Sequence, residues 1–366
     1  MSPTRALIVI VAIAAVACTG TMRQVSQAST ATGKPQWPQR VLWQENATEM
    51  YAEQVLDQTA DVLYTLAPAT NSASQVPNAL RATDLRTGQV RRGAGSYQQY
   101  GLALAAGYLW VYGSNVLDEV DPRTLGTIRS ITLPRAVFAA APYNQVASVA
   151  AGPPGSVWVG TSRALIRLAT ATGAVLSRIA VPAGLDLDDV DDVPGSAYLY
   201  AAAQRTQPTF GAVVLEYSAA TSRLLARTSA GPLPFSLGGA GLTAVPGGVW
   251  ASFRTGMDGQ SMLLSAPSLR IRSGPPWPAE SLYSWTMGST SVYGGGALWV
   301  MTDDGLRACV NPATGKAIAE QMVMSSTAQP AIVLGADKAT GQVIALILSD
   351  DSAAVVGISP PRACWH

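Results

Sequence analysis

Histidine is almost absent from this sequence. The 366 residues contain a single histidine, His366, which is also the last residue. A side chain at a chain end is poorly placed to act as a general base. The count therefore excludes Ser-His-Asp triads, Cys-His pairs and histidine-ligated zinc. The remaining side chains predict no catalytic residue set.

Charged side chains are also scarce. Lys, Arg, Asp and Glu together make up 13% of the chain, and the net charge is +1. No basic run is longer than Arg91-Arg92. Proteins that bind nucleic acid carry basic patches that neutralise phosphates. This composition argues against nucleic acid as a partner.

Long apolar runs are missing, apart from one near the start of the chain. Arg5 precedes an uninterrupted apolar stretch from Ala6 to Ala17. Such a stretch is too short to cross a bilayer, which takes about 20 residues. A positive charge followed by a stretch of this length is typical of a secretory signal peptide. We therefore expect residues 1–17 to be a signal peptide and the chain to be exported.

The residues that follow define a predicted anchor. Ala15-Val16-Ala17-Cys18 resembles the lipobox of bacterial lipoproteins, in which the cysteine thiol receives the lipid. The resemblance implies that Cys18 holds the protein at the outer face of the cytoplasmic membrane. Two other interpretations stay open: an ordinary cleavage site that precedes a cysteine, and an uncleaved anchor. Residues 18–38 are rich in Ser, Thr, Gln, Gly and Pro, and we expect a disordered tether there.

Two further cysteines, Cys309 and Cys364, remain once Cys18 is assigned to the lipid. In an oxidising compartment an even number of cysteines favours a disulfide. We expect these two to pair, and the alternative is two buried thiols. They do not predict a metal site, because two cysteines without histidine partners cannot complete a tetrahedral shell.

Helical periodicity is missing as well, and a repeat of short strands takes its place. The 34 Gly and 24 Pro residues interrupt the chain every few residues. Each repeat has a strand centred on a large apolar side chain, a strand ending near Asp or Asn, a tight turn and a last β-branched strand. The clearest copy runs from Gly155 to Val181. The strand centres are Tyr64, Trp110, Trp158, Leu199, Trp250, Trp299 and Ile344.

The spacing of these centres predicts the fold. They recur every 41 to 51 residues, which fits one four-stranded blade per repeat and exceeds the roughly 20 to 35 residues of most solenoid repeats. A blade cannot cover its own apolar faces, so the blades must stack in a ring. We therefore expect an all-β, seven-bladed β-propeller of four-stranded antiparallel blades over residues 39–366. The seventh blade lacks a fourth strand, and residues 40–43 are expected to supply it.

The recurring Gly-x-Leu/Val-Trp-Val, followed by Asp/Asn-Pro-x-Thr-Gly, resembles the bacterial propellers of the virginiamycin B lyase, NHL, YVTN and quinoprotein-like group. The resemblance covers residues 50–360. The same blades serve lyases, dehydrogenases and binding modules, so the resemblance implies a fold and not an activity. The lyase of that group is understood to use a histidine with a metal ion, which a chain with only His366 does not match.

The densest group of carboxylates lies in the predicted loop between blades three and four. It consists of Asp186, Asp188, Asp189, Asp191 and Asp192. Oxygen-rich loops can bind calcium at extracellular concentrations. The spacing matches no twelve-residue calcium loop, and apolar residues interrupt it. A solvated acidic loop and a calcium site both remain open, and no other cofactor is predicted.

Aromatic residues concentrate in the connections expected on one face of the propeller. The candidates for ligand binding are Phe138, Tyr143, Phe210, Phe235, Trp277, Tyr283 and Trp285. Aromatic rings on one loop face would form a recognition surface for a glycan, a peptide or a protein. The alternative is that they cover the channel end or pack beneath their own loops.

These features predict a non-catalytic, envelope-anchored propeller that acts as a binding or scaffolding platform through its loop face. Its partners would be the membrane, through the lipid anchor, and an unknown protein or glycan. One alternative is a metal-dependent lyase or hydrolase with acidic residues at the channel mouth. A second alternative is a purely structural envelope component.

Overall fold

The protein is described by a computed structural model. The chain divides into two units, Met1–Lys34 and Pro35–His366. The predicted signal peptide and Cys18 lie outside the described residues. The described residues are 37–46, 53–68, 78–97, 101–113, 115–138, 146–192, 196–205, 211–232, 240–255, 258–272, 277–279, 291–301, 306–322, 331–349 and 352–365.

Short strands make up most of the described chain. In chain order they are β1 (Gln39–Asn46), β2 (Glu53–Asp57), β3 (Val62–Pro68), β4 (Asn78–Asp84), β5 (Val90–Tyr97), β6 (Gly101–Ala105), β7 (Tyr108–Gly113), β8 (Val116–Val120), β9 (Thr127–Thr132), β10 (Val146–Ala151), β11 (Ser156–Thr161), β12 (Ala164–Ala169), β13 (Val175–Ala180), β14 (Leu185–Asp192), β15 (Tyr198–Arg205), β16 (Gly211–Ser218), β17 (Leu224–Pro232), β18 (Ala240–Val245), β19 (Gly248–Thr255), β20 (Asp258–Ser265), β21 (Arg270–Ile271), β22 (Trp277–Ala279), β23 (Ser291–Gly294), β24 (Ala297–Met301), β25 (Leu306–Val310), β26 (Ala317–Met322), β27 (Ala331–Asp337), β28 (Gln342–Ser349) and β29 (Ser352–Ile358).

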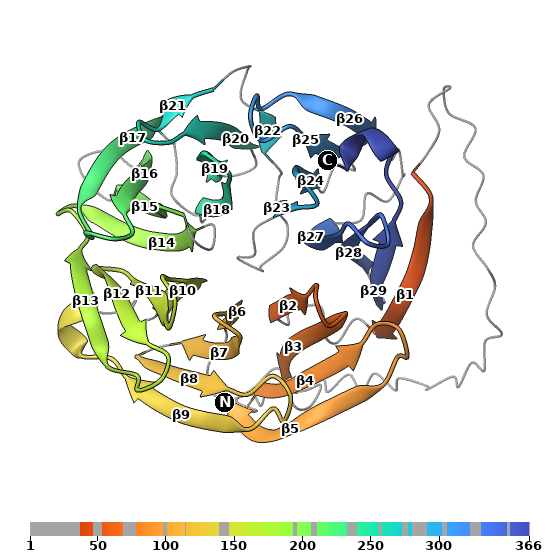
Figure 1. Ribbon diagram of the computed structural model, residues 1–366, viewed down its shortest axis with the longest axis horizontal. Coiled ribbons are helices and arrows are strands. Elements are labelled where there is room, and N and C mark those ends of the chain that lie inside the picture. The colour runs from red at the N-terminus through yellow and green to blue at the C-terminus, as the bar shows by residue number, and fades with distance from the viewer. Residues whose placement is uncertain are drawn as a thin grey trace, which may run out of the picture. The chain divides into compact units, whose positions relative to one another are not determined.

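The strands form seven antiparallel sheets, which are the blades of a ring (Figure 1). Blades one to four are β2 to β5, β6 to β9, β10 to β13 and β14 to β17, each ordered from the centre outward. Blade five is β18 to β21, with β22 also paired to β20, and blade six is β23 to β26. Blade seven is β27, β28, β29 and β1. The predicted all-β, seven-bladed propeller is confirmed.

The large apolar residues at the strand centres fill the spaces between blades. Trp110, Trp158, Trp250 and Trp299 are each at most 1% exposed. Trp158 of blade three packs with Leu187 and Val190 of blade four, and the other three tryptophans meet the next blade in the same way. Because each core is shared by two neighbouring blades, no blade can bury its apolar side chains alone.

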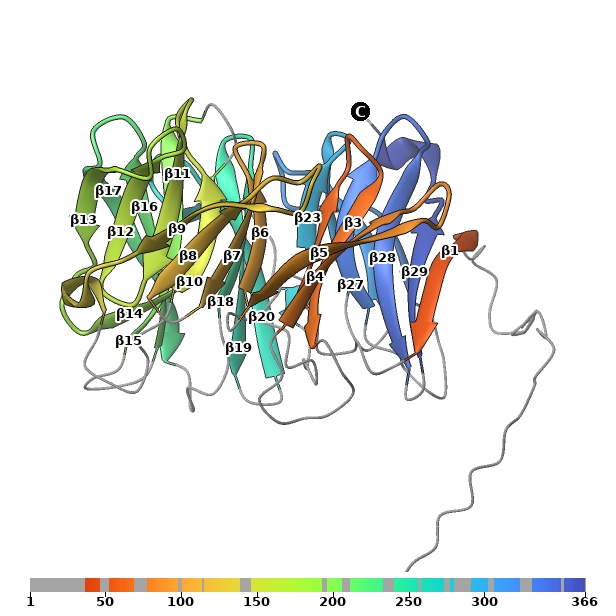
Figure 2. The ribbon, with the colours of Figure 1, turned by 90° about the horizontal axis from the view of Figure 1, so that it is seen from below.

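The two faces of the ring differ. The strands of a blade alternate in direction, so the turns between strands one and two and between strands three and four lie on one face, the turn face. The middle hairpins and the connections to the next blade lie on the opposite face, the loop face. Figure 2 views the ring from the side, with the turn face at its upper edge.

Turns on the turn face follow the predicted chemistry. Asp84 Oδ1 accepts hydrogen bonds from the backbone N–H groups of Arg86 and Thr87, both at 2.9 Å. Asn311 Oδ1 does the same for the N–H groups two and three residues further on. Gly173, which follows a threonine, has a φ of +71°, a conformation that glycine adopts without strain. These turns connect the third strand to the outermost strand in blades one, three and six.

The ring closes by pairing its first strand with its last. β1 lies antiparallel to β29, with Gln39 opposite Ile358 and Asn46 opposite Ser352. The prediction that residues 40–43 complete blade seven is therefore confirmed. The predicted boundary of the tether is corrected, because Trp37 is only 6% exposed and its N–H donates to Gln321 Oε1 at 3.0 Å. Trp37 thus belongs to the propeller and packs with blades six and seven.

A disulfide holds the end of the chain to blade six. Cys309 on β25 is bonded to Cys364, as predicted, and both residues are fully buried. Trp365 packs against Trp299 with ring centroids 4.8 Å apart. The two ends of the propeller are therefore fixed on neighbouring blades.

Helical structure is limited to two single turns within the described ranges. They are the 3-10 helices Arg135–Val137 and Arg362–Cys364. No helix in this part of the chain has the length and hydropathy of a membrane span.

Candidate functional site

The predicted acidic loop is instead a strand. Asp186, Asp188, Asp189, Asp191 and Asp192 all belong to β14, the innermost strand of blade four. Leu187 and Val190 face the core shared with blade three, so they supply the apolar positions of that strand. The residues that interrupt the acidic run are therefore the reason why it forms a strand.

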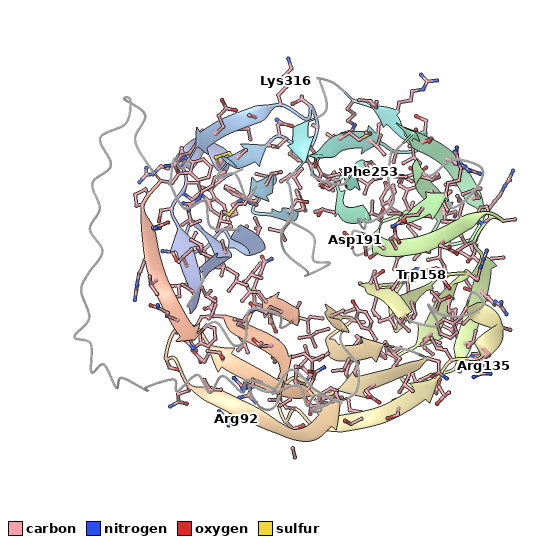
Figure 3. All side chains as sticks on the ribbon, turned by 180° about the vertical axis from the view of Figure 1, so that it is seen from behind. Arg92, Arg135, Trp158, Asp191, Phe253 and Lys316 are labelled. Atoms are coloured by element: carbon pink, nitrogen blue, oxygen red, sulfur yellow. A yellow bond between two sulfur atoms is a disulfide. The ribbon has the colours of Figure 1, made fainter. Side chains whose placement is uncertain are left out.

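Two of these aspartates join blade four to blade five. Asp189 Oδ2 accepts a hydrogen bond from the Leu242 N–H, and Asp191 Oδ2 accepts one from the Ala244 N–H, both at 2.8 Å. Leu242 and Ala244 lie on β18, the innermost strand of blade five. The carboxylates therefore satisfy backbone donors on the inner edge of the next blade. Figure 3 shows Asp191 on the inner side of the ring.

The same kind of contact recurs around the ring. Ser148 on β10 of blade three accepts a hydrogen bond from the Val190 N–H of blade four at 2.7 Å. Thr243 on β18 donates to the backbone oxygen of Ser291 in blade six at 3.0 Å. Short polar side chains on the inner strands thus hold successive blades together. Asp189 and Asp191 make the same kind of contact through their carboxyl groups.

Burial raises the pKa of these carboxyl groups. Loss of solvent raises the pKa of Asp189 to about 6 and that of Asp192 to about 7. The pKa of Asp191 rises to about 8, first because of burial and then because Asp189 and Asp192 lie nearby. Raised carboxyl pKa values often mark active sites, but structural networks also produce them. Here the oxygens of Asp189 and Asp191 are occupied by backbone N–H groups.

The strand geometry does not assemble a calcium site. Calcium takes six to eight oxygen ligands, roughly, around one point. No three His, Cys, Asp or Glu side chains of the described ranges are gathered in a way that could hold a metal ion. Asp186 lies instead 3.6 Å from the Arg163 guanidinium. Of the five predicted ligands, Asp186 therefore lies beside a cation, while Asp189 and Asp191 bind backbone N–H groups of β18.

Sequence reasoning missed a buried carboxylate, Glu216 on β16. Glu216 has no exposed surface, and within the described structure neither of its carboxylate oxygens has a hydrogen-bond partner. Burial raises its pKa to about 7. It lies opposite Tyr200, the position that corresponds to Trp110 in blade two. The sequence signal that could have identified this buried carboxylate is a single charged residue within the apolar run Ala212–Tyr217.

In blade two the carboxylate at the corresponding position is paired with a basic side chain. Glu119 faces Trp110 on one side and Arg129 on the other, and the Arg129 Nε lies 2.8 Å from Glu119 Oε2. In blade four the residue opposite Glu216 on the outer strand is Ala226. Glu216 therefore lacks the cation that the same position receives in blade two.

The raised pKa values of the buried carboxyl groups predict that the stability of the protein depends on pH. Carboxyl groups have pKa values near 4 in an unfolded chain. Because the folded pKa values of Asp189, Asp191, Asp192 and Glu216 are higher, the folded protein binds more protons between pH 4 and 8. The contribution of these four groups to the free energy of unfolding is therefore greatest below about pH 4 and falls as the pH rises from there to about 8. Urea unfolding at pH 5 and pH 8 measures the fall.

Two variants at matched positions should act in opposite directions. Glu216→Gln removes a buried charge, so we expect it to be more stable than the parent at pH 8 and to show a smaller fall with pH. Glu119→Gln breaks a buried ion pair and should cost about 1–3 kcal/mol. Equal effects of the two variants would contradict this account.

The predicted aromatic residues divide into three groups. Phe138 is only 6% exposed and lies in the core between blades two and three, so the expectation that it faces a ligand is corrected. The backbone of Trp277 belongs to β22, with Trp277 opposite Ser261 at the outer edge of blade five. The others lie outside the described residues: Tyr143, Phe210, Phe235, Tyr283 and Trp285.

The architecture defines the chain as a seven-bladed β-propeller with a disulfide-pinned end. Comparison with solved structures finds 1283 similar chains, among them BamB from Moraxella catarrhalis. That structure has a TM-score of 0.50, 18% sequence identity and coverage of 83% of both chains. Such a likeness shows the fold alone. No family model matches the sequence, and neither does any curated protein.

Proposed function

We propose that the protein is a non-catalytic platform, anchored in the cell envelope, that binds a partner protein or a glycan through its loop face. The observation that carries this proposal is the difference between the two faces of the ring. Most turns on the turn face are short, whereas the loop face carries long connections on a rigid ring. Recognition residues are commonly placed on such loops. The longest of these segments include residues 69–77, 133–145, 280–290 and 323–330.

The position of the aromatic candidates supports the same face. Phe235 lies in the connection from blade four to blade five, and Tyr283 and Trp285 lie in the connection from blade five to blade six. Large aromatic side chains contribute strongly to binding where they are exposed. The inner carboxyl groups offer less support for catalysis, because Asp189 and Asp191 already bind backbone N–H groups.

The anchor is part of the proposal. The signal peptide and the motif around Cys18 support attachment to the outer face of the cytoplasmic membrane. Two acyl chains are enough for stable membrane binding. Replacing Cys18 by alanine is then expected to release the protein from the membrane fraction.

Site-specific photo-crosslinking in intact cells tests the platform. A photoreactive amino acid is placed at Phe235 or Tyr283 on the loop face, and at Thr87 or Ala313 on the turn face as matched controls. We expect discrete protein or glycan adducts from the loop-face positions and none from the controls. Absence of adducts from both faces would favour a purely structural component. Adducts from the turn face alone would overturn the proposal.

A further inference from the structure

The large exposed aliphatic side chains that the structure describes all lie on one rim of the propeller. Eight large hydrophobic residues are exposed among the residues that the structure describes, and each is between 40% and 60% exposed. All eight lie within the first three positions of an outermost strand, and they come from six of the seven blades. They are Val41, Val90, Ile128, Val175, Leu176, Leu224, Leu225 and Ile271.

An outermost strand begins on the turn face, so these residues form a band around the outer edge of that face. The band is called the turn-face rim. A propeller places equivalent positions of its blades at similar heights around the ring axis. A flat surface that approaches the turn face can therefore meet the residues of several blades at once.

Basic side chains accompany the band. Arg91 and Arg92 follow Val90, Arg223 precedes Leu224, and Arg270 precedes Ile271, and all four are exposed. Lys316 occupies the corresponding place in blade six, and Figure 3 shows Arg92 and Lys316 at the outer edge of the ring. Arginine beside aliphatic residues suits a surface that is anionic outside and apolar beneath.

Acidic side chains do not balance this charge at the surface. Among the residues whose side-chain burial the structure describes, Glu320 is exposed and the Asp61 side chain, beside Arg86, is 41% exposed. The carboxylates of the turns are partly buried and bind their own turns, as Asp121 Oδ1 does with the Arg123 N–H at 2.8 Å. The charge of these turn carboxylates is therefore directed at backbone N–H groups. Arg92, Arg223 and Arg270 have exposed side chains, whereas the Arg91 guanidinium donates a hydrogen bond to the backbone oxygen of Arg123.

The chain enters the propeller at this same rim. β1 begins at Gln39 on the turn face, directly after the buried Trp37 (Figure 2). Residues 19–36 separate Trp37 from Cys18. A disordered tether of that length, as expected from the sequence, would have a root-mean-square reach of about 25 Å. A lipid on Cys18 would therefore hold the rim close to the bilayer at a high effective concentration.

We infer that the turn-face rim docks on the headgroup region of an anionic phospholipid bilayer and leaves the loop face directed away from the membrane. The inference rests on the proposed anchor at Cys18 and deepens it by naming the surface that meets the lipid. A nucleic acid or an acidic polysaccharide would match the arginines but would leave the eight aliphatic side chains unused. A bilayer matches both, and each arginine near its surface contributes roughly a fivefold gain in binding.

The test measures which face of the anchored full-length protein lies near the lipid. A fluorophore is attached to Leu176→Cys at the turn end of β13, or to Ala183→Cys just beyond its other end as the matched control. The lipidated protein is incorporated into vesicles of phosphatidylcholine and phosphatidylglycerol that contain a headgroup nitroxide. We expect at least severalfold stronger quenching at position 176 than at position 183. Equal quenching, or stronger quenching at 183, would overturn the inference.

Charge variants provide the second arm. Arg91→Gln with Arg92→Gln should reduce the ratio of docked to undocked protein by about 25-fold. The same change at the exposed Arg135 and Arg163, which lie toward the loop face, should leave it nearly unchanged. Docking should also weaken with added salt and in vesicles of phosphatidylcholine alone. Insensitivity to all three changes would overturn the inference.

The outcomes separate this inference from the proposed function. Loop-face adducts in cells without quenching at position 176 would retain the platform and reject the docking. Quenching at position 176 without loop-face adducts would retain the docking and reject the platform. If the protein carries no lipid and does not sediment with anionic vesicles, both the anchor and the docking are rejected.

Discussion

A chain that lacks residues 37–46 loses the cooperative unfolding transition of the closed ring. The deletion removes β1, which pairs with β29 from Gln39 to Asn46, and it also removes Trp37 from the core of blades six and seven. Each lost hydrogen bond contributes about 1 kcal/mol, so the loss for the strand is on the order of 5 kcal/mol. Whole domains are stable by only about 5–15 kcal/mol. The deletion should therefore leave the ring open or unfolded at ambient temperature.

Urea unfolding followed by circular dichroism and by tryptophan fluorescence measures this loss. The control is a chain that lacks residues 19–35, which keeps Trp37 and β1 and should unfold at the same urea concentration as the parent. If the chain without residues 37–46 is insoluble, Trp37→Ala measures part of the same closure and should cost about 3–5 kcal/mol. Unfolding of the deletion at the same urea concentration as the control would show that β1 does not close the ring.

Replacement of Cys309 and Cys364 by alanine lowers the free energy of unfolding by about 4 kcal/mol. The disulfide joins residues separated by 55 positions, and the loss of chain entropy that it imposes on the unfolded state grows with that separation. It also fixes Trp365 against Trp299, so its removal should expose the last residues to carboxypeptidase.

Reductant provides the control for the disulfide. Dithiothreitol should lower the melting temperature of the parent protein and leave that of the double alanine variant unchanged. An unchanged melting temperature of the parent protein after its disulfide has been reduced would show that the bond contributes little to stability.

Most of the fold could be predicted because the repeat is strong. Tryptophan at the centre of a strand, and Thr-Gly after an Asp or Asn, indicate the blades and their turns without knowledge of distant contacts. The closure of blade seven could also be predicted, because the count of strands left one place empty. Trp37 was wrongly assigned to the tether because the residues around it have the composition of the tether. Its place in the propeller depends on Gln321, which is far away in the sequence.

The inner strand of blade four could not be predicted from composition. Five aspartates within seven residues suggest a solvated loop, because isolated carboxylates avoid burial. Asp189 and Asp191 can be buried in β14 because backbone N–H groups of β18 in the next blade donate hydrogen bonds to them. That contact joins residues 53 positions apart and is invisible in local sequence. The compensation of Glu119 by Arg129, and its absence at Glu216, likewise depends on strand register.

The pairing of β1 with β29 imposes an order on folding. The strands of blades one to six each come from a single short stretch of chain, so they can pair through local contacts soon after those residues are available and then pack against the neighbouring blade. Blade seven needs both ends, and β1, although made first, has no partner until residues 352–358 have arrived. Until then the edges of the unfinished ring are open to other chains. Completion of the last blade is therefore the step that closes these strand edges and removes this route to aggregation.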